Sequence, residues 1–117
     1  TRSSVKYQLI IKEFGGWNLF QELLKTLDVI AKSHNTDIGT IASAYIVNRP
    51  GVAAVSVGAR NLTHLESNLK IPTIKFTEPE LGAIAEVLSR SKGPKGPVYY
   101  LERYNDEHRN IMHTNNN

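Results

Sequence analysis

Apolar residues recur every three or four positions over long stretches of this chain, and that period predicts amphipathic helices. The clearest helix is expected from Asn18, a candidate N-cap, to about Ser33. The residues expected on its buried face are Leu19, Leu23, Leu24, Leu27, Ile30 and Ala31. The amphipathic stretch before it is compatible with either a helix or an extended arm, and it ends at Gly15 and Gly16.

A second helix is expected from Asp37 to about Asn48, because Thr36 can cap its first turn and Pro50 closes its end. The residues expected on its buried face are Ile38, Ile41, Ala42, Tyr45 and Ile46. Because Tyr45 belongs to this apolar face, we interpret it as a core residue rather than as a proton donor.

Two capping boxes, in which a glutamate follows a threonine by three residues, predict the starts of two more helices. Thr63 and Glu66 open a short helix that ends near residue 69. Thr77 and Glu80 open a longer helix that ends near residue 89. The residues expected to face inward from this longer helix are Leu81, Ile84, Ala85 and Leu88.

The run VAAVSV, from Val52 to Val57, is apolar on both faces and predicts a strand. Such runs are typical of a parallel sheet that is covered on both sides. A single strand leaves its backbone donors and acceptors without partners, and buried unpaired groups are costly. The strand therefore needs neighbours from another chain or from a larger sheet of which this polypeptide is a piece.

Composition narrows the classes of partner. The 117 residues carry a net charge of +3, but lysine and arginine are scattered, so no nucleic-acid surface is expected. The absence of cysteine excludes disulfides and thiolate metal sites, and no histidine or carboxylate spacing makes a metal site. No apolar run approaches the roughly 20 residues of a membrane span, so we expect no membrane partner and a cytoplasmic location.

The turn after the predicted strand concentrates polar side chains. Gly58 would let a ligand approach the backbone, and Arg60 offers a planar cation suited to phosphate. The following helix start adds free amides and the positive end of its dipole. His64, Ser67 and Asn68 lie three to four residues apart, so they can share one helical face. On these residues alone, a plain connection with a solvated Arg60 is an equally open interpretation.

Two helices, the stretch PGVAAVSVGAR, the pattern L-x-x-N and a last helix opened by T-x-x-E resemble the C-terminal third of an aldo-keto reductase. The aryl-alcohol dehydrogenase-like, NADP-dependent members are the group that the pattern resembles, over about residues 16–89. The resemblance implies an α/β fold: the C-terminal portion of a (β/α)8 TIM barrel, mostly helical, with one or two strands in this chain. Residues 52–57 would be the eighth strand, and the last loops of such barrels commonly hold phosphate.

In that family the same turn and helix hold the adenosine 2′-phosphate and the adenine of NADP(H), so NADP(H) is the cofactor that the resemblance implies. The matching positions here are Gly58, Ala59, Arg60, Asn61, His64, Ser67 and Asn68. The family usually has a glutamate where this chain has Ser67, which implies that adenine recognition is weaker or rearranged. Arg60 is expected to favour a phosphorylated ribose.

The family's catalytic tyrosine, lysine, aspartate and histidine come from the first half of the barrel, so no catalytic residue is assigned to this chain. The chain is expected to be one partial domain, 1–117, with a loop and polar tail at 93–117 that contains His108 and His113. Three interpretations stay open. They are a cofactor-binding enzyme fragment that is inactive alone, a non-catalytic nucleotide-binding or partner-docking protein whose barrel another chain completes, and an unrelated helical domain.

Overall fold

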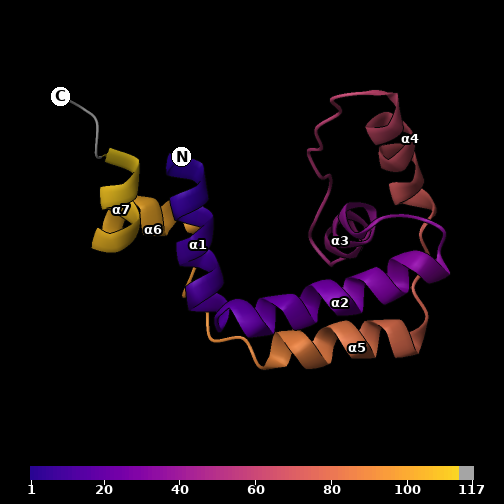
Figure 1. Cartoon of the computed structure of the whole chain (residues 1–117), viewed down its shortest axis with the longest axis horizontal. Coiled ribbons are helices and arrows are strands. Elements are labelled where there is room, and N and C mark those ends of the chain that lie inside the picture. Colours follow the sequence, from indigo (N-terminus) through magenta and orange to yellow (C-terminus); the bar gives the residue numbers. More distant parts are fainter. Residues whose placement is uncertain (114–117) are drawn as a thin grey trace. The chain divides into compact units, whose positions relative to one another are not determined.

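A computed structural model describes residues 1–113, apart from the side chains of residues 98, 99, 112 and 113. The described residues form helices and no strand (Figure 1). The helices are α1 (Arg2–Phe14), α2 (Trp17–Ser33), α3 (Ile38–Val47), α4 (Leu62–Lys70), the 3₁₀-helix η1 (Ile71–Thr73), α5 (Glu78–Ser89), α6 (Val98–Tyr104) and α7 (Asp106–His113). No described helix is both long enough and apolar enough to cross a bilayer. The chain divides into two compact units, Leu23–Glu86 and Thr1–Glu22 with Val87–Asn117.

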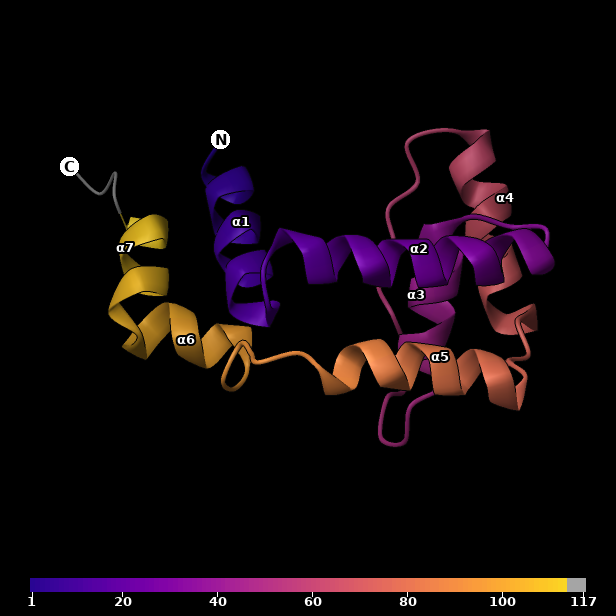
Figure 2. The ribbon, with the colours of Figure 1, turned by 60° about the horizontal axis from the view of Figure 1, so that its bottom comes forward.

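The unit of residues 23–86 has an aliphatic core. Its buried apolar residues are Leu27, Ile30, Ala31, Ile41, Ala44, Ile71, Ile74 and Ile84. Within this unit α2 and α5 run side by side in both views, and α3 contacts α4 and η1 (Figure 2). The period that predicted α2 is confirmed at Leu27, Ile30 and Ala31, each at most 6% exposed. Burial of each larger aliphatic side chain contributes about 1.5–3 kcal/mol.

Two predicted inward faces are narrower than expected. In α3, Ile41 is fully buried, but Ile46 is 46% exposed. In α5, Ile84 is buried and Leu88 is partly buried, whereas Leu81 and Ala85 are exposed. Each helix therefore buries a thin stripe, because only one side of it meets other elements of this chain.

The capping box at the start of α5 is confirmed. The amide of Thr77 donates to Glu80 Oε1 at 2.8 Å, and the amide of Glu80 donates to Thr77 Oγ1 at 3.3 Å. Glu80 Oε2 also lies 2.8 Å from Nε2 of His34, the residue that follows α2. Burial would raise the pKa of Glu80, but the Thr77 amide and the His34 ring together hold that pKa below 4.5.

Three helix starts differ from the prediction. Asp37, not Thr36, caps α3, because its Oδ1 accepts the amide of Thr40 at 2.8 Å. Asn61 takes the place of Thr63 at α4, where its Oδ1 accepts the amide of His64 at 3.0 Å. In both cases the side-chain oxygen that reaches the third following amide sets the first residue of the helix.

The start of α2 also lies before the predicted N-cap, Asn18. The amide of Phe20 donates to the carbonyl of Gly16 at 3.2 Å, so α2 begins at Trp17 and Asn18 lies inside its first turn. Gly15 and Gly16 have φ values of 150° and 94°, which other residues rarely adopt. The break between α1 and α2 therefore falls at these glycines, as predicted.

The strand predicted at Val52–Val57 is not formed in this structure. The residues that connect α3 to α4 have no regular secondary structure, and no described segment pairs with them. A strand exists only as part of a ladder with a neighbour, and this chain supplies none among its described residues. Without a covering layer, Ala53, Ala54, Ser56 and Val57 are exposed. The mostly helical character that the resemblance implied is observed, but its strand is not confirmed.

The unit of residues 1–22 and 87–117 is also helical. The stretch before Gly15 forms the helix α1 (Arg2–Phe14), which is one of the two alternatives left open by its sequence. Residues 98–113 form α6 and α7 where a loop and tail were expected, and α7 packs against both α1 and α6. Residues 114–117 of the expected tail lie outside the described residues, as does the side chain of His113. The single partial domain over 1–117 stays a prediction.

His108 was expected in a loop and polar tail, but it lies in α7 and its side chain is completely buried. Its Nδ1 lies 2.6 Å from Lys6 Nζ, and its Nε2 lies 2.6 Å from Glu13 Oε1. Lys6, itself 7% exposed, also lies 3.4 Å from Glu102 Oε1. With Lys6 as the ammonium, Nδ1 accepts and Nε2 donates to the Glu13 carboxylate. This polar cluster joins α7 to α1.

Candidate functional site

A cavity of about 420 Å³ lies at the turn that leads into α4, within the unit of residues 23–86. The start of α3, one face of α4 and the end of the connection between them, residues 50–58, surround it. We call residues 50–58 the extended segment. Its lining residues are Asp37, Gly39, Thr40, Ser43, Ser56, Val57, Gly58, His64, Ser67 and Asn68. Hydroxyls, amides, an imidazole and one carboxylate thus face a space large enough for a small organic ligand.

Four of the seven residues expected to bind the cofactor line this cavity: Gly58, His64, Ser67 and Asn68. The last three come together because residues three and four apart on a helix share a face. The other three, Ala59, Arg60 and Asn61, lie in the exposed turn and do not line the cavity. The structure therefore places Arg60 outside the cavity that His64, Ser67 and Asn68 line.

The two asparagines of the predicted set hold the turn in shape. Asn68 Nδ2 donates to the carbonyl of Gly58 at 3.0 Å, and Asn61 caps α4 through the amide of His64. These bonds fix the chain between residue 58 and the helix start. Each side chain thus has a structural partner in addition to any ligand.

Gly58 has no structural reason of its own to be glycine. Its backbone is not in the left-handed region, and a Cβ there would meet nothing within 4 Å. The space beside it is open and belongs to the cavity. The geometry therefore leaves room for a ligand to approach the backbone at this position.

Asp37 sets the electrostatics of the cavity. The amide of Thr40 lowers the pKa of Asp37 most, burial raises it in part, and hydrogen bonds from Ser67 and Thr40 and the charge of His64 lower it further. The net effect is a pKa below the ordinary 3.8, so the carboxylate is ionised at neutral pH. The cavity therefore suits ligand groups that donate hydrogen bonds better than it suits a phosphate.

Asp37, Thr40 and Ser43 were missed by the sequence interpretation, which treated their helix only as an apolar face. They occur every three residues, and this spacing was the signal that could have revealed a polar stripe. Thr40 is 2% exposed, and its Oγ1 donates to the carbonyl of Ser67 at 3.3 Å. That bond ties α3 to α4 behind the cavity. Among the side chains that the structure describes, no group of three from histidine, aspartate and glutamate could hold a metal ion.

Comparison with known proteins places the chain in a family. The model of the aldo/keto reductase family matches residues 2–89. An aryl-alcohol dehydrogenase of Pestalotiopsis microspora is 34% identical over 65 residues, which are 55% of this chain and 17% of that protein. The match thus spans about a sixth of that relative's length, and no solved structure matches this chain. The unrelated helical domain is therefore the wrong interpretation, and this chain belongs to the aldo/keto reductase family.

Proposed function

We propose that this chain binds the adenosine end of NADP(H), as part of an oxidoreductase that interconverts carbonyl compounds and alcohols such as aryl alcohols. The supporting observation is the cavity that gathers Gly58, His64, Ser67 and Asn68. Membership of a family that typically uses NADP(H) supports the choice of cofactor. The reaction itself belongs to the whole protein of the family, and a cytoplasmic location, which a cysteine-free chain suits, is part of this proposal.

The cavity fits one part of the cofactor better than the other. The Asp37 carboxylate can accept hydrogen bonds from an adenine amino group or a ribose hydroxyl, but it repels a phosphate. Asp37 lines the same cavity as Ser67, so it supplies the carboxylate that Ser67 itself lacks. Adenine recognition is then rearranged rather than lost.

The 2′-phosphate belongs outside the cavity, at the exposed turn. Arg60 offers a planar fork of donors there, and the dipole of α4 adds positive potential. Asn61 caps only the amide of His64, which leaves the amides of Leu62 and Thr63 for an anion. These groups together suit a phosphate on the ribose.

Binding of NADPH and NADH by the full 117-residue chain tests this assignment. The Arg60→Ala variant is expected to lose about tenfold in affinity for NADPH but little for NADH, because a charge-assisted bond to phosphate is lost. Arg109→Ala is the matched control, since Arg109 pairs with Asp106 in α7, in the other unit. Unchanged NADPH affinity in Arg60→Ala, or no binding by the parent chain, contradicts the proposal.

We also propose that the chain alone has no turnover, because the family's catalytic residues match no positions in it. NADPH oxidation is measured with the purified chain and an aromatic aldehyde. NADPH binding without oxidation is the expected result, and sustained oxidation above the protein-free rate contradicts it.

A second candidate, docking to another chain that completes the barrel, is favoured by exposed apolar side chains beside the cavity. Val57 is 47% exposed, and Leu62, Leu65 and Leu69 on α4 are 77%, 46% and 68% exposed. A soluble protein rarely leaves such a group uncovered. Sedimentation velocity over a range of concentrations tests this candidate: association that Leu62→Ser with Leu69→Ser abolishes supports it, and a concentration-independent monomer argues against self-assembly.

A further inference from the structure

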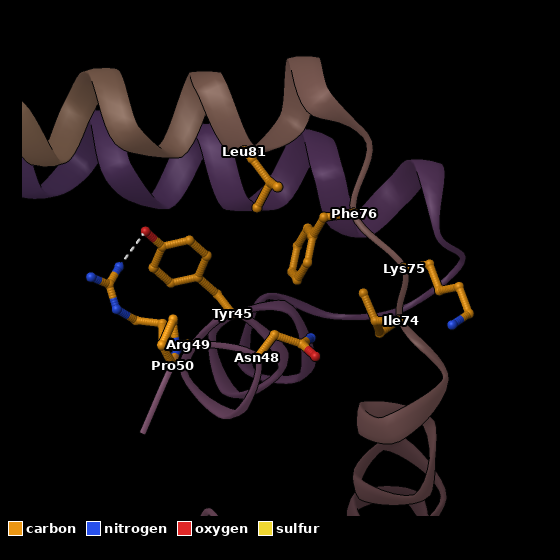
Figure 3. A pocket seen from close by; sticks show the side chains of 8 residues that line it. All are labelled: Tyr45, Asn48, Arg49, Pro50, Ile74, Lys75, Phe76 and Leu81. Atoms are coloured by element: carbon orange, nitrogen blue, oxygen red, sulfur yellow. Dashed lines mark hydrogen bonds between the residues drawn. The ribbon is translucent and has the colours of Figure 1, made fainter. Parts of the chain in front are cut away.

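A second cavity, of about 540 Å³, lies at the other end of the extended segment. The segment begins at Pro50, which lines this cavity, and ends at Gly58, which lines the first one. The lining residues are Tyr45, Asn48, Arg49, Pro50, Ile74, Lys75, Phe76 and Leu81, all within residues 23–86 (Figure 3). The two cavities share no lining residue. The function proposed above therefore makes no use of this second one.

The wall of this cavity is apolar and aromatic. The rings of Tyr45 and Phe76 meet edge to face, with centroids 6.3 Å apart and planes at 86°. In Figure 3 Leu81 points from its helix toward the two rings, and the ring of Phe76 lies beside that of Tyr45. Ile74 closes the wall and is only 8% exposed. A flat apolar body can lie against such a wall and remove most of its own surface from water.

The polar anchor of the cavity is Arg49, which follows α3. Its Nη1 donates to the Tyr45 hydroxyl at 2.8 Å, and its guanidinium carbon lies 5.4 Å from the centre of the Tyr45 ring. One donor and the ring thus hold the guanidinium in place, while its remaining N–H groups stay available. Such pre-organisation lowers the entropic cost of binding an anion.

Both charged side chains that line the cavity are cations. Its lining includes Arg49 and Lys75 but no carboxylate. Within residues 1–113 neither cation forms an ion pair. In Figure 3 Arg49 and Lys75 lie at opposite ends of the row of lining residues. Arg49, which Tyr45 holds in place, is therefore the anchor, and Lys75 contributes only general positive potential.

We infer that this cavity binds a small organic anion with a flat, apolar ring system. Its carboxylate lies on Arg49, and its ring system lies against Tyr45, Phe76 and Leu81. An anion without an apolar body would leave the aromatic wall exposed to water. A neutral arene would leave the guanidinium donors without a strong acceptor. The negative end of the α3 dipole also favours a cation at position 49, so the test must read ligand binding and not stability alone.

The first experiment compares two probes of equal shape on the full chain by isothermal titration calorimetry: 2-naphthoate and the neutral 2-naphthamide. The naphthoate is expected to bind about tenfold more tightly or better, because a guanidinium–carboxylate pair is stronger than a neutral hydrogen bond. Equal affinities, or no binding of the naphthoate, overturn the inference. A saturating concentration of NADPH should leave naphthoate affinity unchanged, and competition between them would also overturn it.

The second experiment assigns the anchor. Arg49→Gln should abolish the preference for naphthoate over naphthamide, and Tyr45→Phe should reduce it severalfold while naphthamide affinity stays constant. Lys75→Gln should lower the affinity for naphthoate only about twofold, because an exposed charge is screened by salt. Lys25→Gln on α2, which does not line the cavity, is the control and should change nothing. A preference that survives both Arg49→Gln and Tyr45→Phe overturns the assignment, and Tyr45→Phe carries the test if Arg49→Gln fails to fold.

Discussion

Two parts of the unit formed by residues 23–86 differ in how far they bury their apolar side chains. In α2, α3 and α5, the residues Ile30, Ile41 and Ile84 are at most 4% exposed. In the extended segment and α4, Val57 is 47% exposed and Leu62 is 77% exposed. A helix satisfies its own backbone and needs only side-chain partners, whereas a strand needs a neighbouring backbone as well. The helices α2, α3 and α5 can therefore each bury a stripe of side chains inside this chain, whereas the predicted strand cannot form, and α4, which follows it, has no buried residue.

The largest expected effect is a loss of stability when the helical part loses core volume. We predict that Ile41→Ala lowers the free energy of unfolding by about 2–5 kcal/mol, because Ile41 is fully buried and a cavity would remain. Urea unfolding followed by far-UV circular dichroism measures this. The matched control is Val29→Ala on α2, where the side chain is 68% exposed and the change should stay within about 0.5 kcal/mol. A loss below about 1 kcal/mol in Ile41→Ala would show that the core is not closed around α3.

The same contrast explains which features the sequence could predict. The period of α2 and the Thr77–Glu80 capping box depend on residues at most four positions apart, so both could be predicted from the sequence. The structure confirms both. A strand depends on partners distant in sequence or in another chain, so the pattern VAAVSV could indicate a strand without being able to form one here. The exact helix starts were predicted less well, because Asp37 and Asn61, and not the nearby threonines, supply the capping oxygens of α3 and α4.

The candidate site and the buried histidine show where sequence patterns stop being informative. Helical spacing was enough to group His64, Ser67 and Asn68 on one face. It could not show that Arg60 lies outside the cavity or that Asp37 lies inside it, because both depend on how α3 packs on α4. His108 stands in a polar stretch, and the Lys6 that it contacts is 102 positions away. No local pattern marks such a pair.

A smaller effect is expected from the polar contact that completes the helical part. We predict that Glu80→Gln costs about 1–2 kcal/mol at neutral pH, because the charged acceptor shared by Thr77 and His34 is lost. The folded state holds the pKa of Glu80 below 4.5, so its contribution is complete above that pH and is lost as pH falls through the lowered pKa. The stability difference between parent and variant should therefore shrink on acidification.

Unfolding free energies of both proteins at neutral and acidic pH measure this dependence. Glu66→Gln on α4 serves as the control, because Glu66 is exposed and should give no such difference. A parent–variant gap that stays constant down to the most acidic condition would mean that Glu80 is not held in its ionised form by Thr77 and His34.

Asn68→Ala should lower the stability less than Glu80→Gln does, but it should also loosen the turn at the end of the extended segment. Its Nδ2 is the donor that holds the Gly58 carbonyl at 3.0 Å, and loss of one such bond costs about 0.5–1.5 kcal/mol. The turn should also become looser, so NADPH affinity is expected to fall as well. Calorimetric titration with NADPH measures this, and Asn18→Ala in the first turn of α2 is the control. Full NADPH affinity in Asn68→Ala would mean that this bond does not shape the site.

The smallest expected effect is the most direct test of the contrast. Val57→Ser should change the unfolding free energy of the chain by less than about 0.5 kcal/mol, because the side chain is 47% exposed and no strand covers it. If residues 52–57 were instead packed inside this chain, the substitution would place a hydroxyl against apolar atoms and remove buried methyl groups, which would cost about 1 kcal/mol or more. Urea unfolding of the two proteins separates these outcomes. In a sheet covered on both sides the same substitution would carry that larger cost, so a near-zero effect here identifies Val57 as a side chain whose packing partners this chain does not supply.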